Sequence, residues 1–109
     1  MANFFNDNES LKFHLSHEMM KEIIQLKERN YADYGKYDDA PKDYEDTLDN
    51  YVKVMEIVGE ITGEILAPNA ESVDQEGPKI VNNEVIYAKG TQQNHEALRD
   101  AGLYGMSLP

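Results

Sequence analysis

The chain has 109 residues, of which 40% are hydrophobic and 28% charged, with a formal net charge of −11 and no cysteine. This length supports one small domain with a thin core. The 10 lysines and arginines are scattered along the chain, which argues against binding to a nucleic acid or an anionic membrane, and the lack of cysteine excludes disulfides and thiolate metal sites. No segment has the pattern of a signal peptide or a membrane span, so we expect a cytoplasmic protein.

Residues 1–45 are predicted to be an N-terminal extension with one amphipathic helix. Apolar side chains recur at the helical period between residues 16 and 31, and Ser16 is in position to cap the first turn. The preceding residues, 9–16, are expected to add a short helical turn. The domain that follows is predicted to cover residues 46–109.

Residues 31–47 are predicted to form turns, because Gly35, Pro41 and a run of acidic residues break any periodicity. The acids do not fit a calcium loop, since Pro41 stands where such a loop turns and the required glycine is missing. We therefore expect the acids to stabilise the N-terminus of the next helix. The tyrosines of the segment are expected to pin it onto the helices: Tyr31, Tyr34, Tyr37 and Tyr44.

The strongest helical pattern predicts one helix from about residue 45 to 76, which ends at Gly77 and Pro78. Pro68 falls inside the pattern, where it is expected to kink the helix rather than end it. The helix carries two apolar stripes. The main stripe, expected to line the core, is Leu48, Tyr51, Val52, Met55, Val58, Gly59, Thr62, Ile65, Leu66 and Val73, and the second stripe is Val54, Ile57 and Ile61.

The period then changes from helical to alternating. The segment KIVNNEVIY, residues 79–87, places Asn82 and Asn83 between two β-branched pairs. Because asparagine tolerates positive φ, this pattern predicts a β-hairpin with a two-residue turn. The fold class is therefore a small, mostly α-helical domain with one β-hairpin insertion.

A last helix is predicted over about residues 92–101, with Thr91 as its N-cap. Gly102 is expected to close it in a left-handed conformation. A short apolar segment, which we call the tail, follows this helix and consists of Leu103, Tyr104, Met106 and Leu108.

Residue types and spacings predict no active site. His14 and His17 could present two imidazoles on one helix face, but no further metal ligand stands at a recognisable spacing. The chain has no glycine-rich phosphate loop and no nucleophile elbow. We therefore predict no catalytic, cofactor-binding or metal-binding residue in this chain.

Two stretches carry more than a periodic pattern, EILAPNAESVDQEG at residues 64–77 and LRDAGLYGMSLP at residues 98–109. Together they resemble the N-terminal helical domain of the acyl-CoA dehydrogenases. In that family one helix carries an acid, an apolar pair, Ala-Pro and a later Asp before a glycine, and a second helix ends in Leu, Ala-Gly-Leu, a further glycine and a proline. The matching residues are Glu64, Ala67, Pro68, Asp74, Gly77, Leu98, Ala101, Gly102, Leu103, Gly105 and Pro109.

The resemblance implies a full-length parent that uses FAD to dehydrogenate an acyl-CoA thioester between its α and β carbons. It implies that the present chain is a fragment truncated after Pro109, with matching residues that are structural. The catalytic base and the contacts to FAD and acyl-CoA would lie in a missing β-domain and a missing C-terminal helical domain, so the fragment alone is expected to be inactive. The hairpin resembles an insertion found in larger members of the family.

The second stripe and the tail are expected to form an interaction surface that the parent would cover. In the isolated chain this surface is expected to cause self-association into a homo-oligomer. The alternative hypothesis is a stand-alone acidic helical module that binds a partner protein through the tail. An open reading frame that encodes Tyr-Gly-Gly soon after codon 109 would favour the dehydrogenase, and a stop codon would favour the module.

Overall fold

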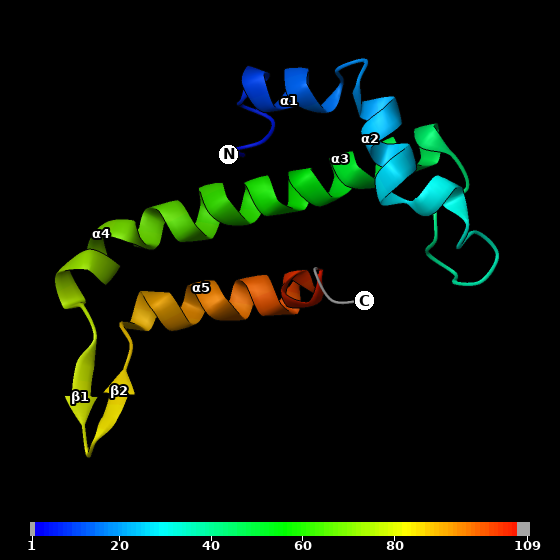
Figure 1. Ribbon diagram of the computed structural model, residues 1–109. Helices are drawn as coiled ribbons and strands as arrows, with labels where there is room; N and C mark the ends of the chain where they lie inside the picture. Colours follow the sequence, from blue (N-terminus) through cyan, green and yellow to red (C-terminus); the bar gives the residue numbers. More distant parts are fainter. Residues whose placement is uncertain (1, 107–109) are drawn as a thin grey trace. The chain divides into compact units, whose positions relative to one another are not determined.

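Figure 1 shows the computed structural model of the chain, which describes residues 2–106. The fold is mostly α-helical with one two-stranded hairpin, as the sequence predicts. The residues group into two units, 5–56 and 2–4 with 57–106. The elements are α1 (Glu9–Leu15), α2 (Met20–Lys27), η1 (Arg29–Tyr31), α3 (Tyr44–Ile61), η2 (Thr62–Leu66), α4 (Ala67–Glu76), β1 (Lys79–Val81), β2 (Glu84–Ile86), α5 (Lys89–Asp100) and η3 (Leu103–Gly105).

In the unit of residues 5–56, α1 forms where a short helical turn is predicted for residues 9–16, and α2 covers only residues 20–27 of the helix predicted for residues 16–31. Asn8 caps α1, because its Oδ1 accepts a hydrogen bond from Leu11 N–H at 3.1 Å. The predicted cap, Ser16, instead follows α1, where its hydroxyl donates to the Lys12 carbonyl at 2.8 Å. The prediction for Ser16 is therefore wrong, because a serine hydroxyl can bond back to the preceding turn as well as cap the next one.

Helix α2 presents only part of its apolar pattern to the core. Ile24 is completely buried, but Met19, Ile23 and Leu26 are exposed by 60%, 48% and 75%. The face that α2 buries is therefore narrower than the apolar pattern of residues 16–31 indicates. A turn held by His17, whose Nδ1 accepts from Met19 N–H at 3.1 Å, leads the chain into α2.

The acids before α3 form the helix cap that the sequence predicts. The Asp43 carboxylate accepts from Asp46 N–H at 2.9 Å, and the Asp46 carboxylate accepts from Lys42 N–H at 3.1 Å. This reciprocal pair satisfies backbone donors at the start of the helix in the manner of a capping box. Thr47, which is buried, donates its hydroxyl to the Asp43 carbonyl at 2.7 Å.

The helical run from Tyr44 to Glu76 is continuous, which confirms the predicted long helix, but it includes a π turn, η2, that the pattern did not reveal. At the end of η2, Ala67 N–H donates to the carbonyl of Thr62, five residues back. Pro68 follows at the start of α4, where it has no N–H for the usual bond to Glu64. The wider turn accommodates the proline, and Figure 1 shows the ribbon bending along α4.

The start of the chain packs on the glycines of this run. Phe4 N–H donates to the Gly59 carbonyl at 3.0 Å. A Cβ atom at Gly63 would lie 2.3 Å from the carbonyl oxygen of Ala2, so the backbone of the N-terminal segment occupies the space that a side chain would need. Both glycines are buried.

The hairpin forms as predicted. Strands β1 and β2 are antiparallel, with Ile80 opposite Val85, and the turn residues Asn82 and Asn83 have φ of 51° and 65°. Positive φ at both positions is the geometry of a type I′ turn, whose twist matches that of the two strands.

Helix α5 begins at Lys89 rather than at the predicted residue 92, and Thr91 lies inside it. The Glu76 carboxylate accepts from Lys89 N–H at 2.5 Å, so the end of α4 caps the start of α5. Gly102 closes the helix with φ 77° and ψ 20°, which confirms its predicted left-handed conformation. Within residues 2–106, no helix is long and apolar enough to cross a membrane.

Candidate functional surfaces

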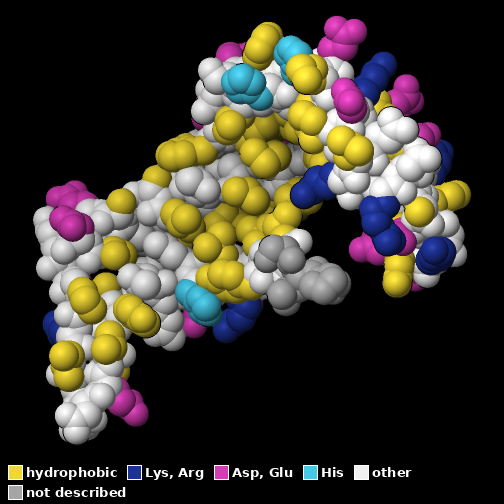
Figure 2. Space-filling view, in the orientation of Figure 1, with side chains coloured by type: hydrophobic (Ala, Val, Ile, Leu, Met, Phe, Trp, Pro, Cys, Tyr) yellow, Lys and Arg dark blue, Asp and Glu magenta, His cyan; other side chains and the backbone are white. Residues whose placement is uncertain are grey.

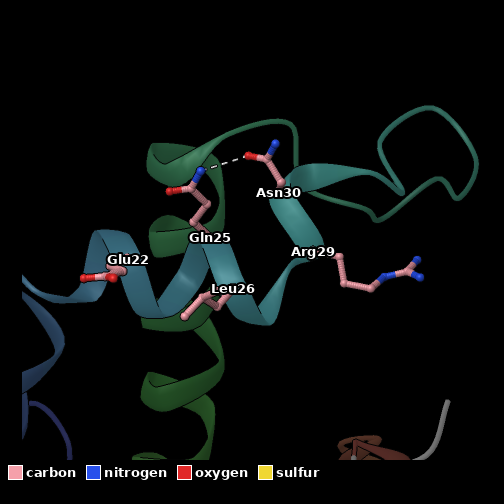
Figure 3. A pocket seen from close by; sticks show the side chains of 5 residues that line it. All are labelled: Glu22, Gln25, Leu26, Arg29 and Asn30. Atoms are coloured by element: carbon pink, nitrogen blue, oxygen red, sulfur yellow. Dashed lines mark hydrogen bonds between the residues drawn. The ribbon is translucent and has the colours of Figure 1, made fainter.

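A polar depression on α2 and η1 is lined by Glu22, Gln25, Leu26, Arg29 and Asn30 and has a volume of about 470 Å³ (Figure 3). The Gln25 amide donates to Asn30 Oδ1 at 3.0 Å. Figure 3 shows Arg29 extending away from these two amides, and its guanidinium is ion-paired with Asp33. The hydrogen bond and charge of Asp33 raise the pKa of Arg29.

This depression is built on a left-handed turn. Arg29, Asn30 and Tyr31 have φ of 50°, 56° and 60°, a conformation that costs an L-residue roughly 1–2 kcal/mol. Among its polar side chains, Gln25 and Asn30 bond to each other, and none of the lining residues forms a nucleophile–base pair of the kind that catalysis requires. We therefore assign the depression a structural role, which is to end α2 and redirect the chain.

Tyr51 of α3 is hydrogen-bonded to Glu28, the residue that precedes this turn. Its hydroxyl donates to Glu28 Oε1 at 2.5 Å. Burial, and then the hydrogen bond to Glu28, raise the pKa of Tyr51, because both disfavour a phenolate next to a carboxylate.

Replacing Tyr51 by phenylalanine is expected to lower the free energy of unfolding by about 1 kcal/mol at pH 7, because Tyr51 is half-buried and its bond partner is charged. Because the pKa of Tyr51 is higher in the folded state, the stabilisation from its hydrogen bond is fully present below the unfolded-state pKa of about 10. This stabilisation is lost as the pH rises above that value. Urea unfolding should therefore show a smaller difference in unfolding free energy between the wild type and Tyr51→Phe at about pH 11 than at pH 7. Tyr37→Phe, at an exposed tyrosine, is the control and should change little at either pH.

The four tyrosines divide into two pairs. Tyr31 and Tyr44 are half-buried, in agreement with the prediction that they pin the segment of residues 31–47. Tyr34 and Tyr37 are 61% and 65% exposed, so for them the prediction is wrong. Tyr34 and Tyr37 form an isolated backbone β-bridge, and Gly35 between them has φ 84°. Their rings lie in solvent.

The residues of the first family-like motif lie on η2 and α4. Glu64, Pro68 and Asp74 are exposed, and Gly77 ends α4 with φ 63° while its N–H donates to the Val73 carbonyl at 3.0 Å. A glycine is required at this position because an L-residue rarely adopts that conformation.

The residues of the second motif lie at the end of α5. Leu98 and Leu103 are half-buried, and Ala101 is the C-cap residue before Gly102. Gly105 lies in η3 without positive φ, and a Cβ atom there would meet nothing within 4 Å, so the structure gives no reason for its glycine. Pro109 lies outside the described residues.

The predicted interaction surface is only partly exposed. Ile57 is 47% exposed, whereas Val54 and Ile61 are half-buried, and Val54 belongs to the unit of residues 5–56. In the tail, Tyr104 and Met106 are 51% and 64% exposed. Leu103 is half-buried, and Leu108 lies outside the described residues.

Tyr104 also has a partner that sequence reasoning missed. Its hydroxyl lies 2.8 Å from Nδ1 of His95, and the two rings are 4.8 Å apart. His95 therefore anchors the tail on α5. A separation of nine residues across a helix end has no recognisable spacing, so the sequence offered no signal for this pair.

Sequence reasoning also missed the exposure of the hairpin. All six strand residues are exposed, and the apolar ones are exposed by 48–78%. Figure 2 shows these hydrophobic side chains gathered over the hairpin. No signal in KIVNNEVIY reveals this exposure, because a short strand of apolar residues has the same sequence pattern whether it is covered or not.

Among residues 2–106, no group of three or more histidine or acidic side chains is arranged to hold a metal ion. In comparisons with known proteins, no family model, curated protein or solved structure matches the chain.

Proposed function

We propose that the chain forms part of the N-terminal helical domain of a flavin-dependent acyl-CoA dehydrogenase. The observation that carries this proposal is the ordered pair of motifs, residues 64–77 and 98–109. Their described residues fall on η2 and α4 and on the end of α5 and η3. Helices α4 and α5 are joined by the Asn69 amide, which donates to Asn94 Oδ1 at 2.8 Å. Both helices end at a motif glycine with positive φ, Gly77 and Gly102, as structural motif residues should.

The proposed parent removes two hydrogens from the α and β carbons of an acyl-CoA thioester, and FAD supplies the redox chemistry. The proposal places the contacts to FAD outside this chain. The depressions of the described residues are lined by acids, tyrosines, amides and a few cations, of which Arg29 is paired with Asp33. A flavin diphosphate needs free cations or a cradle of backbone N–H groups. We therefore assign this chain a structural role and derive no catalytic step from it.

The proposal also predicts what this chain contacts in the full-length parent. The exposed apolar residues Ile57, Tyr104 and Met106 would be covered by the parent's β-domain and C-terminal helical domain. The parent would act as a homo-oligomer, and the absence of cysteine agrees with a reducing compartment such as the cytoplasm.

The chain of 109 residues alone is expected to be colourless and to leave acyl-CoA unchanged, because the base and the flavin contacts would lie elsewhere. The measurement is a visible absorbance spectrum of the purified chain, taken before and after incubation with FAD and removal of unbound flavin. A flavin band that stays with the chain would contradict this assignment. Tyr-Gly-Gly encoded in frame soon after codon 109 is the expected genetic result, and a stop codon at that place would overturn the proposal.

The alternative, a stand-alone interaction module, is favoured by one observation, the large exposed apolar side chains of the hairpin and of η3. Such a module would bind a partner protein through these surfaces. The same stop codon would support it.

A further inference from the structure

The first residues of the chain contact the long helical run at two glycines. Phe4 N–H donates to the Gly59 carbonyl of α3 at 3.0 Å. The Ala2 carbonyl lies against Gly63 of η2, where a Cβ atom on residue 63 would lie 2.3 Å from its oxygen and 2.7 Å from its carbon. We call residues 2–4 the clasp, since their backbone makes both contacts.

The clasp accounts for a glycine inside the helical run. Glycine is a poor helix former, and Gly63 does not have positive φ, so the helix itself gains nothing from it. The atoms that a Cβ would meet first belong to the backbone of Ala2, which cannot turn aside as the end of a flexible side chain can. A larger residue at position 63 would therefore displace the clasp.

The clasp closes residues 5–56 into a loop. Residues 2–4 group with residues 57–106, although the whole of the other unit lies between them in the sequence. The chain therefore enters and leaves the unit of residues 5–56 from segments that are bonded to each other. Holding the ends of a segment together reduces the conformational entropy of its unfolded state, so the segment loses less entropy when it folds.

We propose that the clasp couples the folding of the two units. When the clasp is closed, the unit of residues 5–56 is stabilised through its ends, and by linkage the folding of this unit favours closure of the clasp. Opening of the clasp is a local event, which makes the unit of residues 5–56 open more often. This inference goes beyond the proposed function and does not depend on it.

The test is native-state hydrogen exchange of the full 109-residue chain, followed by NMR. The amide of Ile24, which is completely buried, reports on the unit of residues 5–56. Phe4→Pro removes the N–H that bonds to Gly59 and is expected to speed exchange at Ile24 about fivefold, a factor that corresponds to the net contribution of one hydrogen bond. Phe4→Ala is the matched control, because it removes a ring that is 48% exposed but keeps the N–H, and it should change this rate much less.

Gly63→Ala disrupts the same contact from the helix side. It is expected to abolish the protection of the Phe4 amide and to speed exchange at Ile24, while far-UV circular dichroism shows no loss of helix, because alanine favours a helix. Gly90→Ala is the control for this variant. It introduces a close contact between α5 and α4 in the unit of residues 57–106, away from the clasp, and should speed exchange at Ile24 less.

Three results would each overturn the inference. The first is a Phe4 amide that exchanges in the wild type as fast as in an unfolded chain. The second is an equal rate at Ile24 in Phe4→Pro and Phe4→Ala, which would show that the hydrogen bond to Gly59 does not stabilise the unit of residues 5–56. The third is an equal acceleration by Gly63→Ala and Gly90→Ala, which would show that the two units unfold together whatever the state of the clasp.

Discussion

Replacing Ile24 by alanine is expected to lower the free energy of unfolding by about 2–5 kcal/mol. Ile24 is completely buried, and Thr47 is the other large side chain in the described residues with that degree of burial. The substitution removes buried methyl and methylene groups and leaves a cavity, and both effects add to the loss of stability. Since a small domain has a total stability of only about 5–15 kcal/mol, this one change would remove a large part of it.

Urea unfolding followed by circular dichroism measures the effect. Leu26→Ala is the matched control, because Leu26 lies on the same helix and is 75% exposed, and it should change the free energy by no more than about 0.5 kcal/mol. Equal losses in the two variants would show that α2 does not bury Ile24 in solution.

Gly90→Ala is the second substitution for which we expect a large effect. Alanine normally stabilises a helix by about 1 kcal/mol relative to glycine. Here its Cβ atom would lie 2.6 Å from Cγ2 of Val73 on α4 and 3.3 Å from Cβ of Asn69. Valine in a helix has one strongly preferred rotamer, so its methyl group cannot turn aside. Overpacking of this kind costs about 1–3 kcal/mol, and we expect a net loss of stability.

Gly105→Ala is the control for this substitution. A Cβ atom at Gly105 would have no neighbour within 4 Å, and the backbone there does not need glycine. Thermal unfolding should therefore place the Gly105→Ala variant at or above the wild-type midpoint and the Gly90→Ala variant below it. A Gly90→Ala variant that is more stable than the wild type would show that α4 and α5 are not in close contact.

The parts of the fold that could be predicted are those fixed by local backbone chemistry. The consecutive asparagines at 82 and 83 tolerate positive φ and specify the hairpin turn, and Gly102 specifies the end of α5. The long helix was predictable because its apolar residues keep the helical period through Pro68. None of the residues in its main stripe is exposed, as the prediction requires.

The parts that could not be predicted depend on contacts between distant residues. The start of α5 is set by the Glu76 carboxylate, which lies 13 residues before Lys89 in the sequence. A prediction that considers only neighbouring residues as caps therefore chooses Thr91. The π turn η2 follows from Pro68 but begins ahead of it. Ser16 could follow the end of α1 or cap the start of the next helix, and its hydrogen bond to the Lys12 carbonyl shows that it follows α1.

The candidate surfaces were predictable to a similar degree. Ile57, Tyr104 and Met106 are exposed as expected, but the half-burial of Ile61 depends on packing that a periodic pattern does not record. The bond between His95 and Tyr104 and the exposure of the hairpin appear only in three dimensions. The family resemblance rests on residue identities alone, and it stays a proposal.

The most direct test of the proposed function uses the natural polypeptide that contains this chain, purified and mixed anaerobically with a saturated acyl-CoA. The proposal predicts a yellow protein whose oxidised-flavin absorbance is bleached as the thioester is dehydrogenated. A colourless polypeptide that leaves the acyl-CoA unchanged would contradict it.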